Sequence, residues 1–425
     1  MNILLLGSGG REHALAKKMV TSKICSHLFI APGNAGTAEC GTNLLFAATD
    51  FTALKQSIVA HHIEMVVVGP EDPLVKGVYD FIKGDEETAH VHVIGPSAAA
   101  AQLEGSKAFA KAFMSRHGIP TAAYREFTAD NFEEGISYIQ QHSLPVVLKA
   151  DGLAAGKGVL ICTSHEEAIK GFTEMIKEAK FGAAGNRVVI ESCLRGIEVS
   201  VFVLTDGNEY LILPEAKDYK RVGEGDTGLN TGGMGAVSPV PFFDEALRKK
   251  IEDKIVRPTV AGISEEGMQY KGFVFLGLMI DNGEPYMIEY NCRMGDPETE
   301  VVIPRIESDL VELFLLLSAG KLGAYDLVIR PETAVTTILV SGGYPGAYEV
   351  GKEISGLDVE EENCTVYHCG TKEELGKTVT NGGRVLAVTA FGNDIPSAAA
   401  SSRKTLAGIE FEGLYFRKDI GYEFA

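Results

Sequence analysis

In the first part of the chain, short apolar runs alternate with longer amphipathic segments. The apolar runs lie at 2–6, 28–31, 65–68 and 92–94, and each is followed by a turn that contains glycine. Strands buried on both faces of a parallel sheet have such continuous apolar runs, and the intervening helices cover the sheet. The pattern therefore predicts an α/β domain over 1–104, with a ligand crevice at the carboxyl ends of its strands.

The pattern changes after this domain. A helix is expected over 105–117, where Gly118 and Pro120 end it. Short β-rich runs with one amphipathic helix then indicate a small α+β unit. We expect its strands at 146–149, 159–161, 188–191 and 197–203, and its helix over 166–180.

Two further patterns complete the chain. Apolar runs at 273–280 and 285–292, separated by an Asp-Asn-Gly turn, predict a β-hairpin. A strongly apolar helix is expected over 309–319, and short strands such as 335–340 and 384–389 indicate a β-rich tail. These changes divide the chain into segments 1–104, 105–328 and 329–425, with a small unit at about 121–192 inside the second.

The composition is that of a globular protein, with 45% apolar and 23% charged residues among 425. The formal net charge of −19 argues against nucleic-acid binding and against attachment to anionic membranes. Seven scattered cysteines without a Cys-x-x-Cys pair fit reduced thiols, and the first strand follows no charged leader. We therefore expect a cytoplasmic protein that holds anionic substrates with local lysines, arginines and backbone amides.

The stretch 288–298, which reads IEYNCRMGDPE, carries the clearest candidate chemistry. Alternate side chains of a strand share a face, so Glu289 and Asn291 can direct oxygen atoms to one hard cation, with Arg293 next on that face. The two intervening side chains would point to the other side. Mg²⁺ that holds nucleotide phosphates takes few protein oxygens and keeps water elsewhere. The stretch therefore predicts either a magnesium site or a strand end followed by a charged turn.

The first of three glycine-rich segments, at 7–10, invites a dinucleotide interpretation. It lacks the third glycine of that fingerprint, and the second strand does not end in an acidic residue that would hold a ribose hydroxyl. These departures disfavour a nicotinamide or flavin site. The segment is either a turn that seats a phosphate or sugar at a helix N-terminus or a turn without a ligand.

The second and third segments lie later in the chain. Residues 149–158 resemble a Walker A loop, but too few residues separate the glycines, and Gly158 stands where Ser or Thr would hold magnesium. Because this segment joins two expected strands, it is either a lid over phosphates with Lys149 as a fixed cation, or a solvent-exposed hairpin. Residues 230–236 have three glycines in four positions, which suits either a transient anion or a surface loop.

Together these segments resemble the ATP-grasp ligases and, within them, the phosphoribosylamine–glycine ligase (glycinamide ribonucleotide synthetase) family. The resemblance runs from the first strand to the last domain. Its motifs are GSGGREH at 7–13, GPE at 69–71, KADGLAAGKG at 149–158, NTGGMGA at 230–236 and NCRMGDPET at 291–299. The chain departs from the family's common Gln-Asp-His-Lys-Arg at Lys217 and Tyr219, and Met294 replaces a common Phe.

The resemblance implies a chain of mixed α/β and α+β class. An N-terminal parallel-sheet, Rossmann-like (pre-ATP-grasp) domain would precede an ATP-grasp core and a small β-rich C-terminal domain. ATP would phosphorylate the carboxylate of glycine, and the amine of 5-phosphoribosylamine would attack the resulting glycyl phosphate. The products would be glycinamide ribonucleotide, ADP and phosphate, in de novo purine (IMP) biosynthesis. Mg²⁺ or Mn²⁺ is the implied cofactor, and a monomer or a weak homodimer is expected.

Residue roles follow from the resemblance by position. ATP would be held by Lys107, Lys149, Gly152, Gly156, Lys157 and Gly158 at its phosphates, by Glu191 and Leu194 at adenine, and by Glu198 at ribose. The metal would be held by Glu289 and Asn291, and the catalytic groups would be Arg293, Asp296 and Glu298. The binding sites of the other substrates would be lined by Gly9, Gly10, Asn34, Glu71, Asp218, Lys220, Gly232 and Gly233.

Three alternatives are compatible with the same residues. They are another carboxylate–amine or carboxylate–thiol ligase, a dehydrogenase that uses the first domain, and a nucleotide-binding module without catalysis. Release of ADP that depends on glycine and phosphoribosylamine would separate the first and third, and absorbance of a bound nicotinamide would reveal the second.

Overall fold

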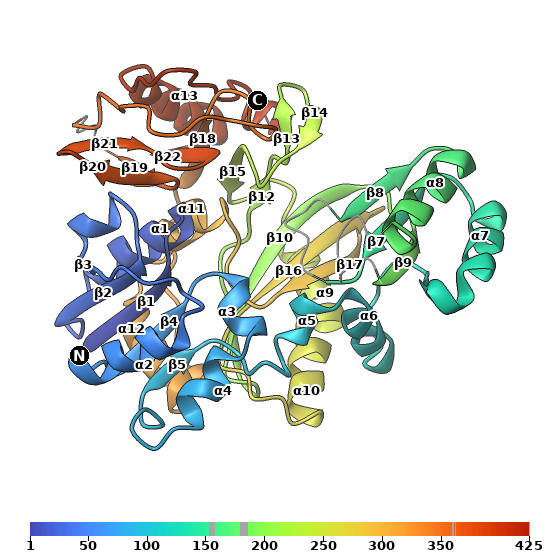
Figure 1. Cartoon of the computed structure of the whole chain (residues 1–425), viewed down its shortest axis with the longest axis horizontal. Coiled ribbons are helices and arrows are strands. Elements are labelled where there is room, and N and C mark those ends of the chain that lie inside the picture. The colour runs from blue at the N-terminus through green and yellow to red at the C-terminus, as the bar shows by residue number, and fades with distance from the viewer. Residues whose placement is uncertain (153–157, 179–185, 359–360, 362, 425) are drawn as a thin grey trace.

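The computed structural model describes all residues except 153–157, 179–185, 359–360, 362 and 425 (Figure 1). The N-terminal domain is a five-stranded parallel sheet in the order β3-β2-β1-β4-β5. The order reverses between β1 and β4, so a crevice opens at the carboxyl ends of these two strands. The strands are β1 (Asn2–Gly7), β2 (His27–Pro32), β3 (Thr42–Asn43), β4 (Met65–Val68) and β5 (His92–Ile94), and the helices are α1 (Gly10–Met19), α2 (Phe51–Ala60), α3 (Glu71–Val75) and α4 (Val78–Lys83).

Two helices lead out of this domain. The short helix α5 (Gln102–Gly105) ends where Ser106 begins to cap α6 (Lys107–Arg116), and Ser106 Oγ accepts a hydrogen bond from Phe109 N at 3.1 Å. The prediction of one helix over 105–117 is therefore wrong at its start, because an N-cap serine begins a new helix. This break places Lys107 in the first turn of α6.

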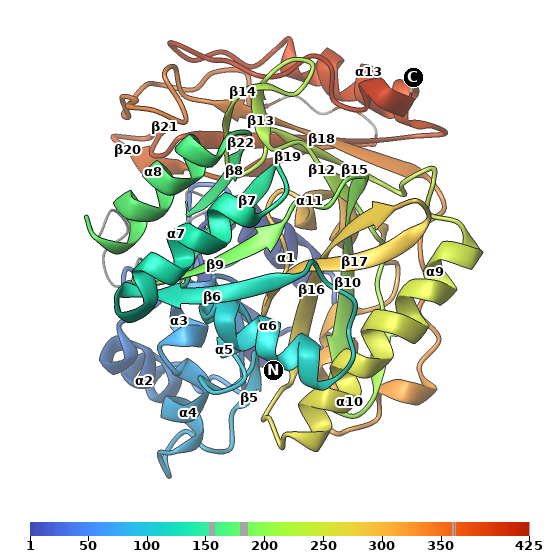
Figure 2. The same cartoon turned by 90° about the vertical axis from the view of Figure 1, so that its right-hand side faces the viewer.

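The small α+β unit is an antiparallel sheet in the order β6-β9-β7-β8 that packs against two helices (Figure 2). The predicted strand over 197–203 exists, but it is wrong to place it in this unit, because it belongs to the central sheet. The elements are β6 (Tyr124–Thr128), β7 (Val146–Ala150), β8 (Val159–Cys162), β9 (Arg187–Ser192), α7 (Phe132–Gln141) and α8 (His165–Ile176). In Figure 1 the unit projects away from the N-terminal domain.

The central sheet has the order β11-β10-β16-β17 and contains the predicted β-hairpin. Asn282 and Gly283 turn the hairpin with φ of 51° and 76°, the left-handed conformation that tight hairpin turns require. The elements are β10 (Ile197–Thr205), β11 (Tyr210–Ile212), β16 (Gly272–Asp281) and β17 (Glu284–Asn291), with α9 (Glu245–Ile251) and α10 (Arg257–Glu265).

The last sheet, in the order β12-β15-β18-β22-β19, joins strands from both sides of residue 328. Strands β12 (Lys217–Asp218) and β15 (Gly235–Ser238) pair with the tail strands β18 (Thr333–Val340), β22 (Arg384–Gly392) and β19 (Cys364–His368). The β-rich tail also holds a helix, α13, that packs on β18 and β22. The remaining elements are β13 (Arg221–Gly223), β14 (Thr227–Asn230), β20 (Thr371–Glu374), β21 (Lys377–Thr380), α11 (Thr299–Val302), α12 (Leu310–Ser318) and α13 (Ile395–Leu406).

One hydrophobic core connects the parts around the crevice. It includes Leu4 of β1, Phe113 of α6, Val201 of β10, Leu276 of β16 and Met287 of β17. Burial of these side chains fixes the N-terminal sheet against the central sheet. Among the described residues, no helix is both long and apolar enough to cross a membrane.

Candidate active site

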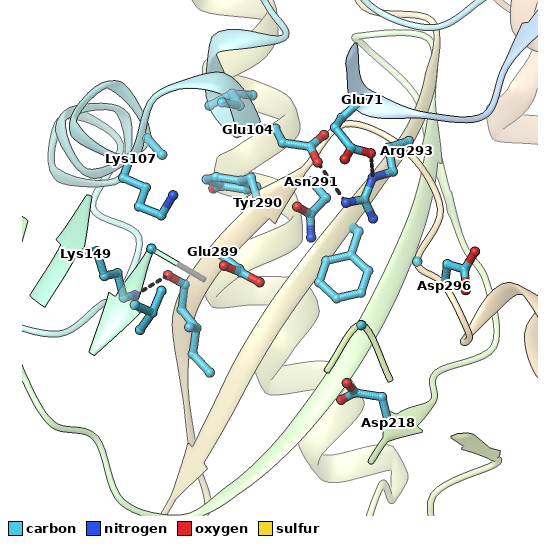
Figure 3. Close-up of a pocket in the computed structure, with 18 of the residues that line it drawn as sticks. Glu71, Glu104, Lys107, Lys149, Asp218, Glu289, Tyr290, Asn291, Arg293 and Asp296 are labelled. Atoms are coloured by element: carbon cyan, nitrogen blue, oxygen red, sulfur yellow. Dashed lines mark hydrogen bonds and ion pairs between the residues drawn. The ribbon is translucent and has the colours of Figure 1, made fainter. Parts of the chain in front are cut away.

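A cavity of about 410 Å³ lies where the N-terminal domain, the small unit, the central sheet and the C-terminal sheet meet (Figure 3). Each part contributes a lining residue at the end of one of its elements. Glu71 begins α3, Lys149 lies near the end of β7, Asn291 ends β17 and Arg384 begins β22. A concave site with convergent charged groups is where we expect substrates to bind.

A β-bulge determines which side chains of β17 face this cavity. The register between β16 and β17 shifts so that Ile288 is an extra residue, and the two faces of the strand exchange there. Glu289 and Asn291 line the cavity, and the buried ring of Tyr290 contributes to the same lining while it packs in the core. Gly277 stands opposite Glu289 and leaves room for its side chain.

Arg293 is held between two carboxylates at one end of the cavity (Figure 3). Its Nε lies 3.3 Å from Glu71 Oε2 and its Nη2 lies 3.0 Å from Glu104 Oε1. When the amide of Asn291 is oriented so that both ends have partners, its nitrogen donates to Glu104 Oε1 at 3.0 Å. Burial raises the pKa of Glu104. Burial would also raise the pKa of Glu71, but Arg293 and Arg11 outweigh it and lower that pKa.

Three lysines surround the other end of the cavity. The buried carboxylate of Glu191 lies 3.2 Å from Lys111 Nζ and 3.0 Å from Lys149 Nζ. Lys107 Nζ donates to Gly152 O at 3.0 Å, and burial lowers the pKa of Lys107. Burial also lowers the pKa of Lys111, to about 8. Three ammonium groups around one carboxylate leave an excess of positive charge at this end, which suits phosphate oxygens.

Lys220, on the cavity wall, links the lining carboxylate of Asp218 to Glu198 behind it. It forms an ion pair with Glu198 and lies 3.9 Å from Asp218 Oδ1. Burial raises the pKa of Asp218. Burial would lower the pKa of Lys220, but Asp218 and Glu198 outweigh it and raise that pKa. Lys220 therefore stays charged, and Glu198 acts on the cavity through it.

Glu298 is a buried carboxyl group that lines the cavity. Its Oε1 accepts a hydrogen bond from Ser200 Oγ at 3.2 Å. Burial and the charge of Asp218 raise the pKa of Glu298 to about 7. The group can therefore exchange a proton near neutral pH, as a general acid or base requires.

Arg384 and Asp296 close the cavity beside the C-terminal sheet. Arg384 Nη2 lies 2.8 Å from Asp296 Oδ1, and Arg384 Nη1 donates to Asp296 O at 2.9 Å and to Gly232 O at 2.8 Å. The segment 230–236 is thus bound to the last sheet.

Several predicted site residues lie behind the lining. A Cβ on Gly9 would lie 3.2 Å from Asp296 Oδ2, and one on Gly10 would collide with Glu300. The side-chain amide nitrogen of Asn34 donates hydrogen bonds to Ser8 O at 2.9 Å and to His368 O at 2.8 Å. The predicted site residues that the structure describes but that do not line the cavity are Gly9, Gly10, Asn34, Leu194, Glu198 and Gly233. Gly156 and Lys157 lie outside the described residues.

The cavity also contains charged residues that the sequence reasoning missed. Arg11 follows the first glycine turn and forms a 2.6 Å ion pair with Glu12, so its place in a GGRE motif was the available signal. Glu104, Lys111 and Arg384 have no such signal, because their partners lie far away in the chain. Cys292 N, for example, donates to Glu104 Oε2 at 2.7 Å across 188 positions.

The donor set fits a divalent cation that is bound mainly by its substrate. The described residues contain no group of three or more His, Cys, Asp and Glu side chains that could hold a metal ion. A carboxylate from Glu289 and an amide oxygen from Asn291 match the one or two protein ligands that Mg²⁺ takes when phosphates and water complete its shell.

Comparisons with known proteins identify relatives along the whole chain. Family models described as phosphoribosylglycinamide synthetase match it in three parts, with the N domain at 1–104, the ATP-grasp (A) domain at 105–299 and the C domain at 334–423. A curated protein from Pasteurella multocida (strain Pm70), named phosphoribosylamine–glycine ligase, is 46% identical over 99% of this chain and 98% of its own.

Two solved structures resemble this chain along nearly its whole length. The crystal structure of a phosphoribosylamine–glycine ligase from Thermotoga maritima superposes with a TM-score of 0.85 and 37% identity, and covers 99% of this chain and 100% of its own. A biotin carboxylase from Campylobacter jejuni, solved as a complex with β-γ-ATP, has a TM-score of 0.74 at 15% identity, over 98% of this chain and 93% of its own. The latter is a likeness of fold alone.

Proposed function

Because the chain belongs to the phosphoribosylglycinamide synthetase family and is therefore an ATP-dependent C–N ligase of purine biosynthesis, we propose that it joins glycine to 5-phosphoribosylamine through glycyl phosphate. One observation carries the proposal. A single cavity brings together lysines suited to phosphates, two oxygen ligands on β17 and guanidinium groups from other parts of the chain. A carboxylate is a poor electrophile, so such a site must first turn one of its oxygens into a phosphate leaving group.

The lysine end of the cavity receives ATP. Lys107 and Lys149 contact its phosphates, together with the segment that contains Gly152, Gly156, Lys157 and Gly158. Glu191 holds Lys111 and Lys149 in place, and its backbone with that of Leu194 lies at the adenine. Glu198 lies at the ribose. Positioning and charge neutralisation are the main tasks of such a site.

Glu289 and Asn291 hold the divalent cation, either Mg²⁺ or Mn²⁺. When bound, the cation neutralises charge on the phosphates and polarises the transferred group. Arg293 lies beyond Asn291 and is oriented by Glu71 and Glu104. Its guanidinium stabilises the charge of the phosphoryl group in transfer.

The opposite end receives glycine and the amine. The glycine carboxylate oxygen attacks the terminal phosphorus and ADP leaves. The amine nitrogen then attacks the acyl carbon and phosphate leaves. The amine must lose a proton in this step, and Glu298, with its pKa of about 7, accepts it while Asp296 orients the reactants.

Phosphoribosylamine binds between the first glycine turn and the segment 230–236. Glu71, Asp218, Lys220 and Gly232 line this region directly. Gly9 and Gly10 allow close approach of the backbone, Gly233 adopts a φ of 121° that favours glycine, and Asn34 fixes the turn through Ser8. We place the enzyme in the cytoplasm, as a monomer or a weak homodimer, and sedimentation over a range of concentrations tests that state.

Release of ADP tests the proposed reaction. The purified protein is incubated with ATP, Mg²⁺, glycine and phosphoribosylamine generated in situ, and each substrate is omitted in turn. We expect rapid ADP release only in the complete mixture. Equal release without glycine would contradict the proposed reaction, and equal release with a thiol in place of the amine would assign the chain to another ligase reaction.

Transfer of oxygen tests the intermediate. If glycyl phosphate forms, one ¹⁸O atom of labelled glycine carboxylate must appear in the released phosphate. Unlabelled phosphate would exclude the acyl phosphate route while leaving the ligase assignment intact.

A further inference from the structure

Among the described residues after position 328, Arg384 is the one that lines the cavity, and no motif identified it. Arg384 is the first residue of β22, and its side chain forms one ion pair and two hydrogen bonds with other segments of the chain. They are the 2.8 Å ion pair with Asp296 Oδ1 and the hydrogen bonds to Asp296 O and Gly232 O at 2.9 and 2.8 Å. A planar guanidinium can satisfy several acceptors at once in a fixed geometry.

The charge of Arg384 is available to Asp296. The neighbouring Glu300 is fully buried, and neither of its carboxyl oxygens has a hydrogen-bond partner among the described residues. Burial and Asp296 raise the pKa of Glu300 well above its usual range. The ion pair of Arg384 is with Asp296, and no ion pair joins it to Glu300 among the described residues.

A second contact holds the same glycine-rich segment to the tail. Gly232 N donates to Tyr344 Oη at 3.0 Å, while Gly232 O accepts from Arg384. Gly233 packs directly against Pro297, beside Asp296, with a φ of 121°. The two tail side chains therefore fix both peptide groups of Gly232 and bring segment 230–236 against Asp296.

These contacts lie far from the nucleotide end of the cavity. Figure 3 places Asp296 on the opposite side of Glu289 from Lys107 and Lys149. Among the described residues, the side chain of Arg384 forms its ion pair and hydrogen bonds with Asp296 and Gly232, not with those lysines or with Glu191. A change at Arg384 should therefore act on the acceptor end and spare ATP binding.

We propose that Arg384 is a positioning residue through which the C-terminal sheet completes the acceptor end of the cavity, by orienting Asp296 and closing segment 230–236 over the amine substrate. The inference rests on the proposed function, because it assigns phosphoribosylamine to this end. In the tail sheet, β15 begins inside the glycine-rich segment and pairs with both β12 and β18.

Steady-state kinetics of Arg384→Gln tests the proposal. We expect the KM for phosphoribosylamine to rise at least about tenfold and kcat to fall, while the KM for ATP changes less than about twofold. Arg384→Lys keeps the positive charge but loses the planar set of N–H donors, so its kcat should lie between those of Arg384→Gln and the wild type. The matched control is Arg403→Gln, an exposed arginine of α13 on the same part of the chain, which should behave like the wild type.

The outcomes separate the inference from the proposed function. Wild-type protein without glycine-dependent ADP release would overturn the function itself. An active wild type with Arg384→Gln indistinguishable from Arg403→Gln, or with equal changes in all three KM values, would overturn the positioning role. If Arg384→Gln does not fold, Tyr344→Phe replaces it as the test, because this change removes only the oxygen that accepts from Gly232 N. For Tyr344→Phe, a higher KM for phosphoribosylamine with unchanged KM values for ATP and glycine supports the proposal. An unchanged KM for phosphoribosylamine contradicts it.

Discussion

At the scale of single residues, Glu289 is the group on which the proposed metal site depends most. Glu289→Gln removes the charge and keeps the shape, so the fold should be intact while metal-dependent turnover falls at least about a hundredfold. Glu284→Gln, on the same strand but paired with Lys250 and Lys254 at the surface, is the matched control. Titration of turnover against Mg²⁺ for both variants measures the effect, and near-normal activity of Glu289→Gln would refute the metal assignment.

Glu298 sets the expected response to pH. As a base it must be ionised, so kcat should rise with pH through about 7, and Glu298→Gln should lack this rise and be slower at pH 8. Exposed Glu245→Gln serves as the control. A Glu298→Gln profile identical to the wild type would remove Glu298 from proton transfer.

The same group affects stability with a defined sign. The folded protein keeps the Glu298 proton up to a pKa of about 7, above the unfolded value of 4.5. The folded state therefore binds more protons between these values, and its stability falls as pH rises through that window. Glu298→Gln should escape this loss and be more stable than the wild type at pH 8 by up to about 3 kcal/mol. Urea unfolding at pH 5 and pH 8 measures the difference.

At the scale of elements, the first glycine turn is limited by its neighbours. A Cβ on Gly10, the first residue of α1, would collide with Glu300 and lie 2.6 Å from Cys369 Sγ. Gly10→Ala should therefore push α1 away from α11 and β19, cost about 1–3 kcal/mol of stability and raise the KM for phosphoribosylamine. Ser8→Ala, in the same turn and exposed, is the control for both measurements. A Gly10→Ala protein as stable as that control would show that the turn has room.

The elements also show what sequence patterns can and cannot predict. The alternation of Glu289 and Asn291 was readable, because a strand has a period of two. The bulge at Ile288, which turns these residues to the cavity, leaves no mark in that period. The predicted helix over 105–117 began too early, because the pattern gave no weight to Ser106 as the N-cap that starts α6 after the short helix α5.

At the scale of the whole molecule, the fold class was predictable and the full cavity was not. Apolar runs and glycine turns identified the parallel sheet, the small unit and the hairpin, since these depend on local patterns. The contacts of Arg384 with Gly232 and Asp296 span 152 and 88 positions, and those of Glu104 span 188. Such pairs depend on how the parts come together, so no local pattern records them.

The most direct test of the account is the stoichiometry of the complete reaction. Mass spectrometry of wild-type reactions with ¹³C-glycine should detect one labelled glycinamide ribonucleotide for each ADP and each phosphate released. ADP formed without a labelled, phosphorylated product, or in the absence of the amine, would contradict the central claim that this cavity couples ATP cleavage to C–N bond formation.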